Sequence, residues 1–498
     1  MKLPFSRSAQ AKFRPDTLPP SMHNDPKVDR PVATDTPLAA AHAVTPSINQ
    51  RIRTQIDHMA RHYPARLAMT VFASIVATVT ALLSLPIATT SGIRAPLADA
   101  LFNATSAVCV TGLTTVDTAN YWSVFGQAVL ALGISIGGLG VMTLASILGF
   151  AVSRHIGLTQ RMLAASETKT SSLGQVGSLL KAVVTTAVAA DLLIFAALLP
   201  RYLTLDYDLA HALWYALFMA ISIFNNAGFV ILPDGLAPHV SDVWMITPII
   251  IGTAVGAVGF PVIMDLTRNW RTPRRLTLHA KLTLTTYVAL AIVGSLIVGT
   301  LEWSNPDTYG DLTITERIMH SLLAGVNARS SGISILDVGQ MTRGTWFVQD
   351  ILMFIGGGSA STAGGIKVTT IAVLTLAVLA EARGDRDIEA FGRRIPPSTV
   401  RLAVAVMLIG VFLVSSAVLI LLLITPYSLD VVLFESISAF ATVGLSTGIT
   451  GDLPDGGKYV LSALMYLGRT GTMTVAAALA LRERRRVIRM PQERPIIG

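Results

Sequence analysis

The sequence predicts an all-α membrane protein with four membrane–pore–membrane repeats around a central pore, and three observations lead to this fold class. Hydrophobic residues make up 52% of the 498 residues and charged residues only 14%, whereas about a quarter of the residues in soluble domains are charged. Apolar runs of about 20 residues, which is enough to cross a bilayer, recur along the chain. A short apolar segment that ends in a glycine turn lies between the runs and occurs four times.

The four short segments align on their glycines, which are Gly112, Gly228, Gly332 and Gly444. In three of them a Leu-Phe pair lies eleven residues before the glycine, and a serine lies six residues before it, namely Ser106, Ser222 and Ser438. The third segment departs from this pattern, with Ser321 and Val326 in those places. Intervals of 116, 104 and 112 residues separate the glycines, so one repeat has the length of one membrane module.

Two long apolar runs flank each short segment. We therefore expect eight spanning helices, near residues 67–87, 125–152, 183–199, 243–266, 282–301, 347–379, 402–424 and 459–481. The repeats are expected at residues 51–165, 166–278, 279–395 and 396–486, between a disordered, proline-rich cytoplasmic tail at 1–50 and a cytoplasmic C-terminal tail at 487–498.

The short segments cannot span the bilayer, so each must enter the membrane and return on the same side. Irregular backbone at membrane depth is tolerated only where it is buried in protein or lines a watery cavity. Four re-entrant pore helices, one in each repeat, therefore predict a pore.

Basic residues lie between the repeats and after the last one, whereas the loops on the other side are comparatively acidic. The formal net charge of +8 thus indicates positive-inside topology, with both termini cytoplasmic, rather than nucleic-acid binding. The single cysteine, Cys109, excludes an intrachain disulfide and a cysteine-based metal site.

The glycine turns have the composition of a cation filter. Backbone carbonyls can replace the hydration water of a potassium ion, and inward carbonyls in succession need dihedrals that glycine adopts without steric cost. Because the turns are neutral, they favour a monovalent ion over Ca²⁺ or Mg²⁺, whose sites use carboxylates. A lone glycine is more often a packing or turn residue, but four in matched context favour a filter. The candidate carbonyl donors are Val110, Thr111, Gly112, Asn226, Ala227, Gly228, Ser330, Ser331, Gly332, Thr442, Val443 and Gly444.

A second group of small residues follows each filter glycine, as close helix packing around a pore requires. In the third repeat these residues are too rich in glycine and hydroxyls for a continuous helix. We expect an unwound, mobile loop below the filter, a candidate gate formed by Gly356, Gly357, Gly358, Ser359, Thr362, Gly364 and Gly365. A phosphate loop is not expected, because Lys367 does not directly follow the last glycine and no βαβ context exists.

Two arginines near these segments are further candidates. Arg469 interrupts an apolar helix of the fourth repeat, where a charge is expensive and either serves function or forms a buried structural pair. Arg329 precedes Gly332 by three residues. It is expected either to pair with a carboxylate such as Glu316 or Asp337 or to influence permeation.

At these residues the chain resembles the superfamily of potassium transporters that includes the Trk, Ktr and HKT proteins. The resemblance covers roughly residues 60–485 and is closest to the KtrB branch. The glycine loop and LGRTG at 467–471 match that branch, as do VTGLTTVDT at 110–118, FNNAGF at 224–229, NARSSGI at 327–333 and ATVGLSTGIT at 441–450.

The resemblance implies a transporter rather than an enzyme: potassium uptake across a bacterial plasma (inner) membrane, with Na⁺ as a candidate coupling or activating ion. It also implies a homodimer on a cytosolic, KtrA-like regulatory octamer that binds ATP/ADP or NAD(H), whereas this chain itself binds no nucleotide and no nucleic acid. Two alternatives stay open, a proton-coupled Trk-type symporter and a pore subunit associated with a potassium pump.

Overall fold

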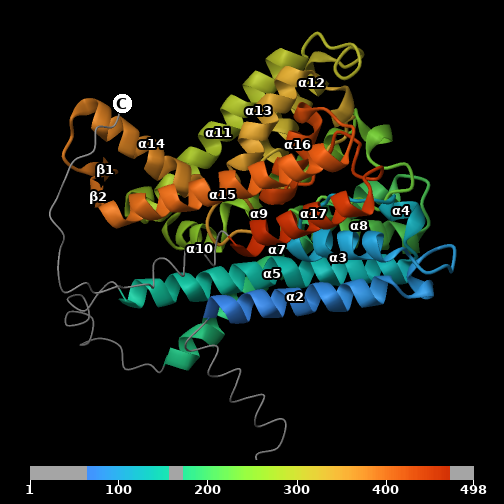
Figure 1. Cartoon of the computed structure of the whole chain (residues 1–498), viewed down its shortest axis with the longest axis horizontal. Coiled ribbons are helices and arrows are strands. Elements are labelled where there is room, and N and C mark those ends of the chain that lie inside the picture. Colours follow the sequence, from blue (N-terminus) through green and yellow to red (C-terminus); the bar gives the residue numbers. More distant parts are fainter. Residues whose placement is uncertain (1–63, 156–171, 472–498) are drawn as a thin grey trace, which may run out of the picture. The chain divides into compact units, whose positions relative to one another are not determined.

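The computed structural model describes residues 64–155 and 172–471, which are mostly helical (Figure 1). The expectations for the tails at 1–50 and 487–498 lie outside the described residues, as does the end of the last apolar run. Within the described residues, a long helix, a short helix and a further helix or pair of helices follow one another four times.

In each of the first two repeats, a long helix is followed by a short one and then by the returning helix or helices. The first repeat contains α2 (Pro64–Leu83), η1 (Pro86–Ala88), α3 (Leu97–Cys109), α4 (Thr118–Tyr121) and α5 (Val124–His155). The second contains α7 (Ser172–Leu203), α8 (Leu209–Asn225), η2 (Ala237–His239), α9 (Val243–Val258) and α10 (Phe260–Asn269).

The third repeat follows the turn η3 (Pro273–Arg275), and a small hairpin connects it to the fourth. Its helices are α11 (Leu278–Glu302), α12 (Ile314–Asn327), η4 (Val338–Gln340), α13 (Arg343–Phe354) and α14 (Val368–Arg383). The antiparallel hairpin consists of β1 (Ile388–Ala390) and β2 (Arg393–Ile395). The fourth repeat contains α15 (Pro397–Ile424), α16 (Leu429–Ala441), α17 (Asp455–Tyr466) and the π-helical turn η5 (Leu467–Gly471).

The short helices α3, α8, α12 and α16 are the expected pore helices, and their packing closes a ring. Each packs against the first helix of its own repeat, α2, α7, α11 and α15 respectively. Between repeats, α5 packs on α8, α9 on α12, α13 on α16, and α17 on α3. The last contact joins the fourth repeat to the first, as the neighbouring labels α17 and α3 illustrate in Figure 1.

The burial pattern agrees with an apolar solvent around this ring. Nearly every residue of α3 from Ala98 to Cys109 is buried. By contrast, α7 and α15 expose large apolar side chains, for example Leu193 (73% exposed) and Leu423 (78% exposed). Such surface is costly in water but not in lipid, so the outer helices face the membrane and the short helices lie inside.

Some of the expected spans are not straight helices. Among the described residues, Leu180–Leu203, Leu278–Glu302 and Pro397–Ile424 are single helices that are long and apolar enough to cross a bilayer. The run expected at 243–266 bends by 97° between α9 and α10, where Gly259 has a φ of 98° and Pro261 follows. The run expected at 347–379 is broken between α13 and α14. The count of eight spanning helices stays a prediction.

Candidate functional site

Three of the four pore helices end in the same unusual conformation. The residue two places before the glycine is left-handed in α3, α8 and α16, with φ values of 57° at Val110, 60° at Asn226 and 48° at Thr442. For a residue other than glycine this conformation costs roughly 1–2 kcal/mol. Because it recurs at matched positions, the surrounding structure must impose it. All four filter glycines, including Gly332 of the third repeat, also have positive φ, between 61° and 100°.

The serine six residues before the glycine ties the turn to the pore helix. Ser106 Oγ accepts a hydrogen bond from the Gly112 N–H at 3.0 Å, and Ser438 Oγ accepts one from the Gly444 N–H at 3.1 Å. In the second repeat, Ser222 Oγ donates to the carbonyl of Phe229, the residue after the glycine, at 2.7 Å. The repeated serine therefore serves the geometry of the turn.

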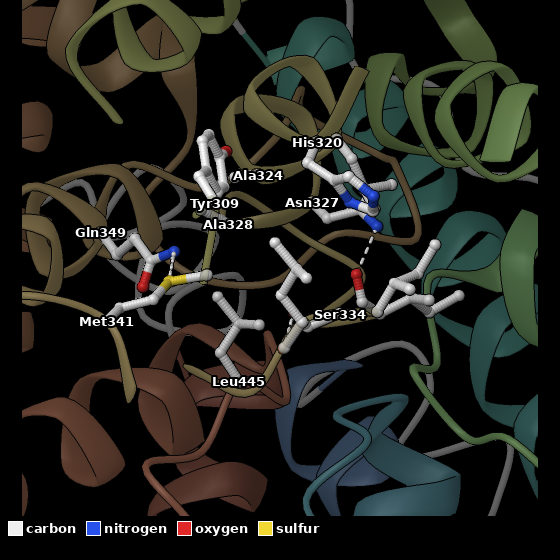
Figure 2. A pocket seen from close by; sticks show the side chains of 13 residues that line it. Tyr309, His320, Ala324, Asn327, Ala328, Ser334, Met341, Gln349 and Leu445 are labelled. Atoms are coloured by element: carbon white, nitrogen blue, oxygen red, sulfur yellow. Dashed lines mark hydrogen bonds between the residues drawn. The ribbon is translucent and has the colours of Figure 1, made fainter. Parts of the chain in front are cut away.

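In the third repeat Asn327 takes the place of that serine. Its side-chain Nδ2 donates to the Ile333 carbonyl at 2.7 Å (Figure 2), which matches the bond from Ser222 to Phe229. The Asn327 carbonyl also accepts from Ser331 N and Gly332 N, at 3.2 and 3.3 Å. Alignment on the glycines places Val326 at the serine position. The structural equivalent is the next residue, because α12 ends in a right-handed cap at Ala328.

The four glycines close a ring with no space for side chains. A Cβ on Gly112 would lie 2.9 Å from Gly228 Cα, and one on Gly228 would lie 2.5 Å from the Ser331 carbonyl oxygen. A Cβ on Gly332 would lie 2.8 Å from Gly444 Cα, and one on Gly444 would lie 3.1 Å from Gly112 Cα. Each turn thus touches the next, in the order of the repeats.

The predicted carbonyl donors come together at this ring. In every repeat the two residues before the glycine are buried, and the glycine itself is half-buried. One carbonyl from each turn would meet a Cβ on the neighbouring glycine, namely those of Thr111, Ala227, Ser331 and Val443.

An open hollow of about 520 Å³ adjoins the ring. Its lining includes the filter glycines Gly112 and Gly228 and two acidic residues, Asp117 and Asp234. Acidic side chains at the mouth of a cleft raise the local concentration of cations. No group of three or more histidine, cysteine, aspartate or glutamate side chains that could hold a metal ion occurs among the residues described.

The glycine loop between α13 and α14 is unwound, as expected, and packs tightly. A bridge between Ile355 and Ile366 closes its ends, and Gly358 N donates to the Ala257 carbonyl at 2.8 Å. A Cβ on Gly364 would lie 2.6 Å from the carbonyl oxygen of Ala441, at the end of the fourth pore helix. The predicted gate residues lie here; all are buried except the half-buried Ser359, which shares a hydrogen bond with Thr369.

Arg469 meets this loop. It lies in the π-helical turn η5, is 2% exposed, and donates from Nη1 to the carbonyl of Thr362. Its Nε and Nη2 have no hydrogen-bond partner within residues 64–155 and 172–471, and no carboxylate pairs with it there. Lys367, at the end of the loop, donates to the Ala363 carbonyl at 2.6 Å. The structure therefore joins loop and arginine, which lie about 100 residues apart in the sequence.

The second group of glycines lets helices touch the ends of the pore helices. A Cβ on Gly137, Gly256 or Gly468 would collide with a carbonyl oxygen four residues before a filter glycine, those of Val108, Phe224 and Phe440 respectively. Small residues permit such close approach of helix backbones.

The prediction that Arg329 pairs with a carboxylate such as Glu316 or Asp337 is wrong. Arg329 is fully buried, donates from Nη1 to the Tyr287 carbonyl at 2.7 Å, and stacks 3.5 Å above the Tyr287 ring. Glu316 instead forms the capping box of α12 with Thr313, and Asp337 caps η4. A cation–π contact satisfies part of the guanidinium without a carboxylate, and the sequence contains no periodic signal for it.

Comparison with known proteins supports this architecture. Residues 42–487 match the TrkH family, described as a cation transport protein. The chain is 39% identical over 404 residues to the Ktr system potassium uptake protein B of Bacillus subtilis, covering 81% of this chain and 89% of that protein. It is 34% identical over 424 residues to the potassium/sodium uptake protein NtpJ of Enterococcus hirae, with coverages of 84% and 93%.

The likeness extends to a solved structure. The crystal structure of the potassium transporter TrkH from Vibrio parahaemolyticus matches with a TM-score of 0.64 at 16% identity, covering 82% of this chain and 84% of that one. At this identity the match speaks for the fold alone.

Proposed function

The chain belongs to the TrkH family of cation transport proteins, and from this premise we propose that it is a channel-like potassium uptake transporter. The observation that carries the proposal is the ring of four neutral glycine turns. Relatives described as potassium uptake proteins share 34–39% of their residues with it.

In the proposed mechanism, a potassium ion gathers in the acidic hollow near Asp117 and Asp234 and loses water at the ring. The carbonyls of the twelve candidate donors, three from each turn, replace that water. The four pore helices end at the turns, so the negative ends of their dipoles stabilise a cation there. The hydrogen bonds that Ser106 and Ser438 accept, and those that Ser222 and Asn327 donate, hold the turns in place.

Below the filter, the glycine loop and Arg469 form the proposed gate. The loop belongs to the third repeat, yet it contacts the second and fourth pore helices through Thr362 and Gly364. These two helices lie across the ring from each other, so the loop lies across the ion path. The Arg469 guanidinium adds a positive charge to this barrier.

We further propose that the protein lies in the bacterial plasma membrane with both termini cytoplasmic, as a homodimer on a KtrA-like cytosolic octamer that binds ATP/ADP or NAD(H). The basic connectors would form the docking surface. Sodium dependence is proposed because the relative NtpJ is described as a potassium/sodium uptake protein.

Rubidium flux into proteoliposomes that contain only this chain tests the proposal. We expect uptake that potassium competes for and that sodium on the outer side increases. Uptake that follows an imposed proton gradient and ignores sodium would favour the Trk-type symporter. Correctly inserted protein without any flux would overturn independent transport and favour a pore subunit of a pump.

A further inference from the structure

The side chain of Asn226 contacts three separate elements beneath the filter. In the amide orientation that satisfies all its neighbours, its oxygen accepts from Thr362 Oγ1 at 2.5 Å and from Ala257 N at 3.2 Å. Its nitrogen donates to Ser330 Oγ and to the Thr253 carbonyl, both at 3.2 Å. One fully buried amide thus joins the second filter turn to the third turn, to α9 and to the glycine loop.

The backbone at this position explains why an asparagine fits. Asn226 is the left-handed cap of α8, with a φ of 60°, and asparagine adopts this conformation more readily than most residues. The matched caps in the first and fourth repeats are Val110 and Thr442, which have no amide. Among these three caps, Asn226 alone has a side-chain amide, whose nitrogen can donate two hydrogen bonds while its oxygen accepts two.

Thr362 is the matching contact on the loop, and it is held from two sides. Its hydroxyl meets Asn226, whereas its carbonyl accepts from Arg469 across the ring. Gly256 leaves the space for this contact, because a Cβ there would lie 2.7 Å from the Asn226 amide and 3.0 Å from Thr362 Oγ1. Removal of the Thr362 hydroxyl would deprive the buried Asn226 amide of one of its hydrogen bonds, which is costly.

We propose that Asn226 is a positioning residue that couples the gate to the filter. While the loop is closed, the Thr362 hydroxyl fixes the Asn226 amide, and that amide fixes Ser330 and hence the spacing of the second and third turns. When the loop moves, Asn226 loses this partner and the two turns relax. Ion selectivity thus depends on the state of the loop. This inference rests on the proposed function.

The test substitutes Thr362 in the loop and measures the ion selectivity of the filter. Thr362→Val removes the hydroxyl and keeps both the shape and the carbonyl that Arg469 binds. We expect the preference for rubidium over sodium flux to fall by a factor of roughly 2 to 10, the range that one hydrogen bond of ordinary strength supplies. Thr362→Ser retains the hydroxyl and should restore the preference. The matched control is Ser361→Ala, which removes a buried hydroxyl that bonds only within the loop, to the Gly358 carbonyl, and should leave the preference unchanged.

A double mutant separates coupling from independent damage. Asn226→Gly removes the amide and keeps the left-handed backbone at no steric cost. Adding Thr362→Val to it should lower the preference no further, because the two residues act through one contact. Additive losses, or a normal preference in Thr362→Val, would overturn the coupling even if the wild-type chain transports potassium. Absence of flux from the wild-type chain would count against the proposed function instead.

Discussion

At the scale of single residues, the filter depends on the absence of side chains and on a few short hydrogen bonds. Gly112 and Gly444 have φ values of 97° and 100°, and a Cβ on Gly444 would lie only 3.1 Å from Gly112 Cα. A side chain there meets both backbone strain and a collision with a neighbouring carbonyl. Gly448 has nearly the same φ, 101°, but no atom lies within 4 Å of a Cβ there. Comparison with Gly448 therefore separates the cost of backbone strain from the cost of the collision.

Gly112→Ser and Gly444→Ser are expected to weaken the preference for potassium over sodium while the protein still enters the membrane. The strain alone is roughly 1–2 kcal/mol, and a shift of about 1.4 kcal/mol between two ions is a tenfold change. Gly448→Ser is the control, because Gly448 has a φ of 101° but no atom within 4 Å of a Cβ. Competitive rubidium flux is the measurement, and equal selectivity in all three variants would remove the glycine ring as the filter.

Asn327→Leu tests the assignment of Asn327 as the counterpart of the repeated serine. Loss of its bond to the Ile333 carbonyl should cost about 1 kcal/mol and lower the potassium preference several-fold. Val326→Thr, at the position that sequence alignment matches to the serine, should leave it unchanged, since a helical threonine can bond to its own helix. The opposite ranking of the two variants in the same flux assay would contradict the assignment.

At the scale of elements, the sequence predicted what depends on periodicity and composition. The pore helices, the glycine turns and the unwound loop all follow from runs of apolar residues and from the positions of their breakers, and the structure has helices ending at each expected turn. Contacts between distant residues left no such pattern. The cation–π contact of Arg329 with Tyr287, 42 residues away, depends on the packing of α11 against α12, and the role of Asn327 depends on the right-handed cap of α12.

The loop itself provides a test at this scale. Its ends already meet, because Gly356 N donates to the Ile366 carbonyl at 2.9 Å and a Cβ on Gly356 would touch the Gly364 carbonyl oxygen. Deletion of residues 357–363 should therefore be tolerated and should raise potassium flux by removing the obstruction. Reconstituted flux per inserted molecule is the readout. Lower flux from protein of normal size and stability would show that the loop supports the pore and that the gate lies elsewhere.

At the scale of the whole molecule, the four repeats are similar, but the third differs from the others in what it places against the pore helices. The first, second and fourth repeats bring glycine helices against the pore-helix ends at Gly137, Gly256 and Gly468. The third repeat instead sends its loop across the ring to the second and fourth. A cytosolic partner that shifts the helices on either side of this loop would move the obstruction without rebuilding the filter.

Substitutions of Arg469 test whether the loop and this arginine together obstruct the ion path. Two unit charges roughly 4 Å apart interact by about 4 kcal/mol at an effective dielectric constant near 20, so a guanidinium beside the path slows each potassium ion. Arg469→Ala should raise flux and blunt its dependence on the partner, and Arg469→Lys should resemble the wild type. Arg469→Gln separates the two contributions, because it removes the charge but retains a donor for the Thr362 carbonyl. High flux in the Gln variant assigns the barrier to the charge, and wild-type flux assigns it to the hydrogen bond. If the Ala and Gln variants both misfold, the arginine is a structural tie between η5 and the loop and takes no part in gating.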